Sequence, residues 1–254
     1  FQVDPSWPQL PNNMATGLVS SVAVDQKDNV WILHRPRVSV PKGKTAAPPV
    51  IQLDANGKYV QGWGGPSEAY EWPDSEHGIY VDETNSVWIG GSSRPGAGVC
   101  VDALENKCTR GDDMLLKFTA QGKFIMAIGK RNANTGARDT QNVHSSTDVF
   151  VYKGELYVSD GYEGPGNQGN RRAIVFDANT GAFKRMWGAY GNVPMDSPDM
   201  LKNARTPPAP RPARGRGGAA PAAAAAPAPP LPPVGTPSKV VLGTDPGPQQ
   251  FIGD

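Results

Sequence analysis

The chain has 254 residues, with 25 basic and 24 acidic side chains and a formal net charge of +1 at pH 7. No apolar run approaches the length of about 18 residues that a membrane-spanning helix needs, so we expect no such span. The alternation of apolar and polar residues that is typical of β-strands dominates, and no stretch keeps a long helical period. The sequence therefore predicts an all-β protein.

Three similar units follow one another along the chain, at residues 17–65, 77–130 and 144–193. Each unit contains four short β-rich segments joined by turns of Asp, Asn and Gly. Trp31, Trp88 and Tyr157 occupy equivalent positions in the three units. The predicted strands are 22–25, 30–33, 50–54 and 59–64 in the first unit, 79–82, 87–89, 115–118 and 124–129 in the second, and 149–151, 156–158, 174–176 and 183–188 in the third.

A lone four-stranded antiparallel sheet leaves both faces and both edges exposed, and radial stacking of such sheets as the blades of a β-propeller covers them. Propellers typically contain about four to eight blades, so three blades are too few to close a ring. Residues 1–16 read as an N-terminal extension, and residues 247–254 as the start of a fourth blade. We expect the front half of a longer propeller, or a partner that supplies the remaining blades. The alternative is a complete three-sheet protein with an open apolar face.

Residues 194–246 have the composition of a flexible insertion between blades. They contain eleven prolines between Ala204 and Pro237, and such a segment buries too little apolar area to offset its ordering entropy. Six of the 25 basic residues and no acid lie in 200–244, so the rest of the chain, with all 24 acidic residues, is net acidic. The alternative is an arm for nucleic acid or an anionic surface, but no aromatic residues are interleaved with the arginines.

The only cysteines, Cys100 and Cys108, lie in one Gly-rich segment of the second unit. A disulfide between them would close a short loop and contribute about 2–3 kcal/mol. Such a pair fits an oxidising compartment, whereas the alternatives are two free cytosolic thiols or a metal site. The chain begins with Phe1 rather than methionine, as a mature product would. We therefore expect a periplasmic or secreted protein.

The direction of the strands places several side chains at one rim of the propeller. The first strand of a blade leaves this rim and the second returns to it, near the central axis. His77 lies just before a first strand, and Arg35 and Tyr162 lie just after second strands. Neutral imidazole is a usual zinc ligand, so His77 is the candidate metal ligand. His34 and His144 map to the same rim. The structural alternatives are a strand cap for His34 and a place in a polar loop for His144. For Arg35 the alternative is an ion pair, and for Tyr162 it is packing in a turn.

The repeats resemble NHL repeats, and in particular those of peptidyl-α-hydroxyglycine α-amidating lyase, a six-bladed propeller whose central zinc is held by three histidines. The resemblance covers residues 17–191 and rests on segments 19–35, 77–89 and 147–177. After Arg35, the chain continues with Pro36-Arg37-Val38 instead of the lyase pattern.

This resemblance implies a role for each of five residues. It makes His77 a zinc ligand and Arg35 and Tyr162 catalytic residues, and it places a structural calcium ion on the backbone carbonyls of Val19 and Ile79. The other two zinc histidines would lie beyond the given sequence.

Three functions compete. The repeats, the expanded loops and the expected compartment favour an extracytoplasmic scaffold that binds a protein or a small ligand at a propeller face. The resemblance favours a zinc-dependent lyase, in which Tyr162 acts as base and Arg35 stabilises developing negative charge. RNA binding requires a basic face with stacking aromatic residues, which the net acidic folded part disfavours. The scaffold is our first hypothesis and the lyase is the alternative.

Overall fold

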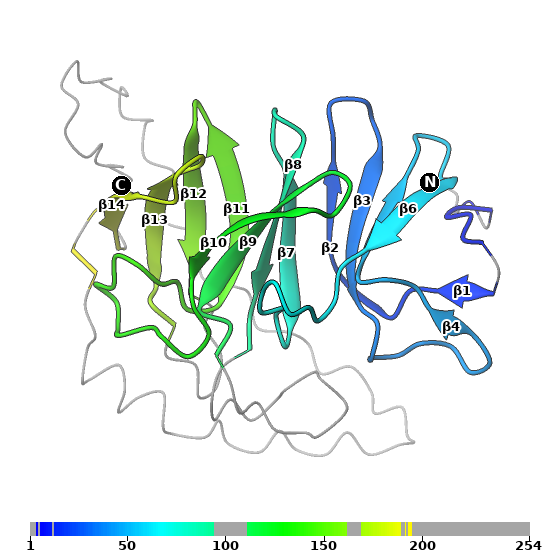
Figure 1. Cartoon of the computed structure of the whole chain (residues 1–254), viewed down its shortest axis with the longest axis horizontal. Coiled ribbons are helices and arrows are strands. Elements are labelled where there is room, and N and C mark those ends of the chain that lie inside the picture. The colour runs from blue at the N-terminus through cyan, green and yellow to red at the C-terminus, as the bar shows by residue number, and fades with distance from the viewer. Residues whose placement is uncertain are drawn as a thin grey trace, which may run out of the picture.

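Three four-stranded antiparallel sheets stand next to one another like the blades of a propeller (Figure 1). The structure is a computed structural model and describes residues 4, 6–11, 13–93, 111–161, 169–188, 191 and 193–194. These residues form fourteen β-strands and no α-helix. Accordingly, no helix in the described part of the chain is suited to crossing a membrane.

The strands of each blade are ordered as they occur in the sequence, and consecutive strands pair antiparallel. The first strands of neighbouring blades lie against one another, β2 against β7 and β7 against β11, and we refer to these three as the inner strands. The first blade contains β2 (Leu18–Val24), β3 (Val30–Arg35), β5 (Val50–Leu53) and β6 (Tyr59–Trp63); the second contains β7 (Glu76–Val81), β8 (Ser86–Gly91), β9 (Met114–Thr119) and β10 (Phe124–Gly129); the third contains β11 (Ser146–Tyr152), β12 (Glu155–Asp160), β13 (Arg172–Asp177) and β14 (Phe183–Trp187).

The first two blades use the same tryptophan–aspartate pair to fix their first turn. Trp31 Nε1 donates to Asp25 Oδ2 at 3.0 Å, and Trp88 Nε1 donates to Asp82 Oδ2 at 2.9 Å. The other oxygen of each carboxylate accepts backbone N–H groups of the turn. In the third blade Tyr157 takes the place of the tryptophan, and its hydroxyl donates to Glu155 Oε2 at 2.8 Å. In the first two blades the indole therefore joins the first turn to the second strand, whereas in the third blade the bond stays within β12.

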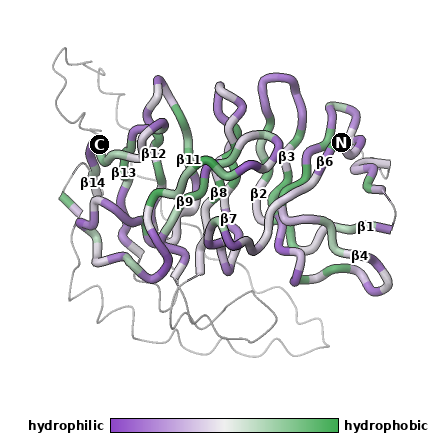
Figure 2. Tube along the Cα trace, viewed as in Figure 1, coloured by the Kyte–Doolittle hydropathy of each residue, from purple (hydrophilic) through white to green (hydrophobic). Residues whose placement is uncertain are grey.

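Apolar residues fill the space between neighbouring blades. One cluster, which includes Trp31, Ile79 and Phe118, lies between the first and second blades, and a second cluster, which includes Trp88 and Leu156, lies between the second and third. Figure 2 shows hydrophobic residues along the strands and hydrophilic residues in the hairpin turns at the upper edge. Blade-to-blade burial is therefore the main packing interaction of this fold.

Each inner strand carries a β-bulge near its start. The pairing register shifts between Val19 and Ser21 in β2, between Glu76 and Gly78 in β7, and between Ser146 and Asp148 in β11. The extra residues are Ser20, His77 and Thr147. A bulge bends its strand and changes the direction in which the extra side chain points, so these three residues occupy equivalent places around the inner edge.

The structure confirms the predicted all-β, blade-like architecture with its three four-stranded sheets. Sequence patterning did not predict a short parallel pair, β1 (Met14–Ala15) with β4 (Thr45–Ala46). Each of these strands has only two residues, too few for alternation to be recognised. Apart from Pro194, the predicted insertion 194–246 and the predicted fourth-blade segment 247–254 lie outside the described residues.

Candidate functional site

The candidate site is the rim of the blades at which the inner strands begin and the second strands end, the lower edge in Figure 1. Polar and ionisable side chains gather there from all three blades. His77 lies within β7 rather than before it, because the bulge extends the pairing to Glu76. Gly78 makes the approach of the third blade to this strand possible, since a Cβ there would lie 2.9 Å from the carbonyl oxygen of Thr147.

His77 is half-buried and its Nδ1 lies 3.0 Å from the carbonyl oxygen of Thr147. A carbonyl oxygen only accepts, so Nδ1 carries the proton and Nε2 is the lone-pair nitrogen of the neutral ring. Metal-ligating histidines commonly have this arrangement. His77 therefore links the second and third blades.

Arg35 is buried and joins the first blade to the second. Its Nε donates to the backbone carbonyl of Glu76 at 3.0 Å. The Glu76 side chain is fully buried and accepts a hydrogen bond from Trp72 Nε1 at 2.8 Å, and Arg37 Nη2 lies 3.7 Å from its other oxygen. Burial raises the pKa of Glu76, while the Trp72 bond and the charge of Arg37 oppose that rise. The resemblance makes Arg35 catalytic, whereas in the structure its Nε makes a contact that holds the first two blades together.

His34 is fully buried and both of its ring nitrogens are used within the fold. The backbone N–H of Gly17 donates to Nδ1 at 3.0 Å, and Nε2 lies 2.8 Å from the carbonyl oxygen of Pro48. Nε2 is therefore the protonated nitrogen. Burial lowers the pKa of His34, which keeps the ring neutral. His34 holds strand ends together.

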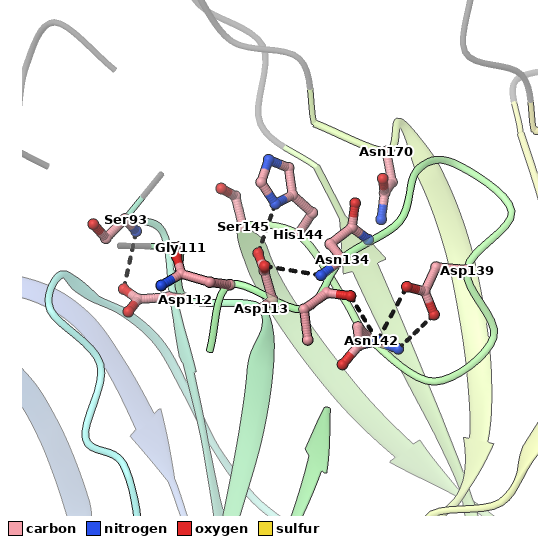
Figure 3. Close-up of polar contacts among 12 residues, drawn as sticks. Ser93, Gly111, Asp112, Asp113, Asn134, Asp139, Asn142, His144, Ser145 and Asn170 are labelled. Carbon is pink, nitrogen blue, oxygen red and sulfur yellow. Dashed lines mark hydrogen bonds and ion pairs between the residues drawn. The ribbon is translucent and has the colours of Figure 1, made fainter. Parts of the chain in front are cut away.

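His144 and Asp113 form the most direct side-chain pair of the rim (Figure 3). His144 Nδ1 lies 2.6 Å from Asp113 Oδ1, and Asp113 Oδ2 accepts the backbone N–H of Asn134 at 3.0 Å. The carboxylate is nearly buried, whereas the imidazole is partly exposed. In Figure 3 the second ring nitrogen of His144 points away from Asp113. This pair orients the second ring nitrogen outward, as in carboxylate–histidine pairs of functional sites.

Asp112, next to Asp113, ties two segments of the rim together. Its carboxylate accepts the backbone N–H groups of Asp74, Ser75 and Ser93 at 2.9, 3.0 and 2.9 Å. The side chain has no exposure, and burial raises its pKa to about 7 in spite of these hydrogen bonds.

A cavity of about 650 Å³ opens beside this rim, between β10 and the loop 130–142. The loop is held from inside by Asp139, which accepts N–H groups of Thr135, Gln141 and Asn142. Burial opposes ionisation of Asp139, but these hydrogen bonds outweigh it and lower its pKa to about 2. The cavity is lined by Ala127, Gly129, Lys130, Ala133, Thr135, Arg138, Asp139, Thr140, Gln141 and Asn142.

A buried ion pair fixes the same loop to the third blade. Arg172 Nε donates to Asp160 Oδ2 at 2.7 Å, and both side chains are fully buried. Arg172 also donates through Nη1 to the carbonyl oxygen of Ala137 at 3.0 Å and through Nη2 to that of Asn142 at 2.7 Å. The guanidinium therefore satisfies loop carbonyls that would otherwise be buried without partners.

The structure describes four of the five residues to which the resemblance gives a role. Val19 lies at the exposed start of β2, whereas Ile79 lies beyond the bulge of β7 with a buried side chain. Tyr162, Cys100 and Cys108 lie outside the described residues. Within the described ranges, no three His, Cys, Asp or Glu side chains are grouped to hold a metal ion. A zinc site needs at least three protein ligands, so His77 would need partners from elsewhere. Calcium prefers oxygen ligands, and backbone carbonyls are of that kind.

Sequence reasoning missed Asp112 and Asp113 and assigned His144 to a polar loop. The available signal was the run Gly111-Asp112-Asp113 directly before a predicted strand, at the rim end of the second blade. Nothing in the local sequence pairs Asp113 with a histidine 31 residues away.

No protein-family model matches the chain, and no curated protein sequence is significantly similar to it. Among solved structures, the chain is similar to the WD40 repeats of RRP9, with 8% sequence identity and a TM-score of 0.39 over 69% of this chain and 40% of that chain. It is also similar to the computationally designed Ika8 protein, with 10% identity and a TM-score of 0.38 over 69% of this chain and 38% of that chain. The chain thus spans about two fifths of the length of both structures. The assignment of propeller blades rests on the sheets themselves.

Proposed function

We propose that this chain is an extracytoplasmic β-propeller scaffold with NHL-type repeats, and that its rim binds a ligand with an acidic group. The observation that carries the proposal is the cavity of about 650 Å³ beside the rim, with Lys130 and Arg138 in its lining. Ligand sites are typically largely pre-formed concave surfaces with a few placed polar groups. The pair Cys100 and Cys108 supports the extracytoplasmic location.

The charges of the lining favour an acidic ligand. Asp139 is the only acidic residue of the lining, and its carboxylate is already bonded to N–H groups of its own loop. Lys130 and Arg138 are exposed residues of the cavity lining, and Arg138 Nε donates to the carbonyl oxygen of Pro194 at 3.1 Å. Arginine binds carboxylate or phosphate through two parallel hydrogen bonds and lysine binds as a point charge. The loop is also held by Arg172 and needs little further ordering, which reduces the entropic cost of binding.

The experiment is calorimetric titration of the full chain with citrate, inorganic phosphate and a penta-aspartate peptide. We expect at least one probe to bind, and Lys130→Ala and Arg138→Ala to weaken that binding about tenfold each, because each removes a charge-assisted hydrogen bond. Lys27→Ala is the matched control, since Lys27 is exposed in the β2–β3 turn, at the opposite edge. Binding that neither cavity substitution changes would contradict the proposal.

The zinc-dependent lyase remains a second candidate, because His77 has the tautomer of a metal ligand. A bound zinc ion would polarise a substrate oxygen, with Tyr162 as the base. The hydrogen bond from Arg35 to Glu76 weighs against a catalytic role for that arginine. Purified protein would then contain one zinc per chain, His77→Ala would lose it, and an α-hydroxyglycine peptide would be cleaved. Zinc well below one per chain, with no cleavage, would eliminate this candidate.

A further inference from the structure

The first blade exposes the face that the second and third blades bury. Val22, Ile79 and Val149 are equivalent, since each follows the bulge of its inner strand. Ile79 is 3% exposed against the first blade and Val149 is 6% exposed against the second, whereas Val22 is 55% exposed. Val24, two residues further along β2, is 58% exposed. This face of the first blade is apolar in the same way as its equivalents but is not covered in the same way.

The N-terminal segment packs on part of this face, as the segment between the first two blades packs at their interface. Between the first two blades, Tyr70 and Trp72 of the connecting segment pack into the shared apolar cluster. On the face of the first blade that carries Val22, Leu10 and Met14 pack in a corresponding way against a cluster of Ile32, Ala47, Ile51 and Leu53. What stays exposed is the inner part, at Val22 and Val24. In the other blades this part is covered by the neighbouring blade.

The third blade exposes its other face, the one on which a following blade would pack. Trp31 and Trp88 belong to the faces on which the following blade packs, and both are fully buried. Their equivalent Tyr157 pairs with Phe150 in the third blade, just as Trp88 pairs with Tyr80 in the second. On that face Phe150 is 53% exposed and Tyr152 is 52% exposed. Large exposed apolar residues that cluster on one face mark an interaction surface.

Polar contacts also join neighbouring blades at their outer turns. Gln61 Nε2 of the first blade donates to the carbonyl oxygen of Ala120, in the outer turn of the second blade, at 2.9 Å. Lys117 Nζ of the second blade donates to the carbonyl oxygen of Ala178, in the equivalent turn of the third, at 2.8 Å. The corresponding turn residue of the first blade is Ala55, which is exposed. Arg185 stands at the position of Gln61, and its guanidinium is bonded to Glu155 and Tyr157 of its own blade.

We propose that a second copy of this chain covers both faces, with the third blade of each copy packed on the first blade of the other. The described blades of one chain expose one face of each kind, so the contact is head-to-tail. Such contacts form closed rings when the rotation allows. The described blades of two copies number six, within the range of about four to eight that closed propellers have.

The test is size-exclusion chromatography of the full chain with light scattering, over a dilution series. The expected mass is twice 26.9 kDa. Val24→Glu and Tyr152→Glu place a charge on opposite faces and should each give the monomer mass, with unchanged far-ultraviolet circular dichroism because both side chains are exposed in the single chain. Ile125→Glu is the control: Ile125 is 45% exposed on β10 of the second blade, away from both faces, and its variant should keep the dimer mass.

Mixing the two variants separates this arrangement from other dimers. A Val24→Glu copy and a Tyr152→Glu copy share one interface in which neither partner is changed, so the mixture should regain the dimer mass that each variant loses alone. A dimer that joins like faces would not be restored in this way. A monomer mass for the unchanged chain, a mass above twice 26.9 kDa, or a dimer insensitive to both substitutions would each overturn the proposal.

Discussion

His77 Nδ1 and the carbonyl oxygen of Thr147 are joined at 3.0 Å, and each of the two residues is the extra residue of a bulge in an inner strand. The bond therefore connects equivalent points of neighbouring blades. It also sets the tautomer of the only histidine that the resemblance makes a zinc ligand.

Loss of the His77 hydrogen bond to Thr147 should measurably lower the free energy of unfolding. We expect His77→Ala to lower the free energy of unfolding by about 1 kcal/mol, the usual contribution of one hydrogen bond. His77→Asn should recover part of this loss, because the amide N–H of asparagine can take the place of Nδ1–H. Urea unfolding followed by circular dichroism would measure both. Equal losses in the two variants would mean that ring packing, not the hydrogen bond, is what His77 contributes.

Breaking the buried ion pair of Arg172 and Asp160 should lower the stability of the fold much more than removing the His77 hydrogen bond. Arg172→Met leaves the Asp160 carboxylate buried without its ion partner, and breaking a buried pair in this way costs about 3–5 kcal/mol. The double variant Arg172→Met/Asp160→Leu should be more stable than the single variant, because it removes the uncompensated charge. Denaturant midpoints compare the three proteins. Hydrogen exchange in 130–142 should rise in both variants, since both lose the bonds to loop carbonyls.

The repeated tryptophan–aspartate pair offers a comparison within one chain. Trp88→Phe keeps most of the buried ring but removes the donor to Asp82, and we expect a loss of about 1–3 kcal/mol from the unsatisfied carboxylate. Asp82→Ala should cost at least as much, since this carboxylate also binds Thr84 and Ser86. Thermal unfolding of both variants provides the measurement. A neutral Trp88→Phe would show that the indole contributes only packing.

Asp139 should make part of the stability depend on acid pH. Its pKa is lowered from 3.8 to about 2, since N–H groups of the loop bind the ionised form. A lowered pKa stabilises the fold above the unfolded value and ceases to do so as pH falls through the folded value. Asp139→Asn should therefore cost about 2 kcal/mol near neutrality, the scale of hydrogen bonds to a charged group, and progressively less between about pH 4 and 2. Urea unfolding at several pH values would test this; a cost that is constant with pH would contradict it.

Local sequence determined the blades. Alternation with a period of two residues and turns of Asp, Asn and Gly depend on neighbouring residues alone, which is why segments such as 124–129 match an observed strand. The bulge at His77 was not recognised, because a bulge depends on the pairing of two strands and not on either one. The apolar faces followed from the same alternation, but Val22, Ile79 and Val149 differ in exposure only because of which blades flank them.

The side-chain contacts at the rim could not be predicted from local sequence, because they depend on tertiary structure. Asp113 meets His144, Asp112 meets backbone N–H groups of Ser75 and Ser93, and Arg172 reaches loop carbonyls 30 or more residues away. These contacts arise where blade packing brings loop ends together. A buried carboxylate takes whichever donors surround it, because an unpaired one is costly. The sequence by itself determined that this protein is built from repeated four-stranded sheets, and the packing of one sheet on the next decided which side chains form its site.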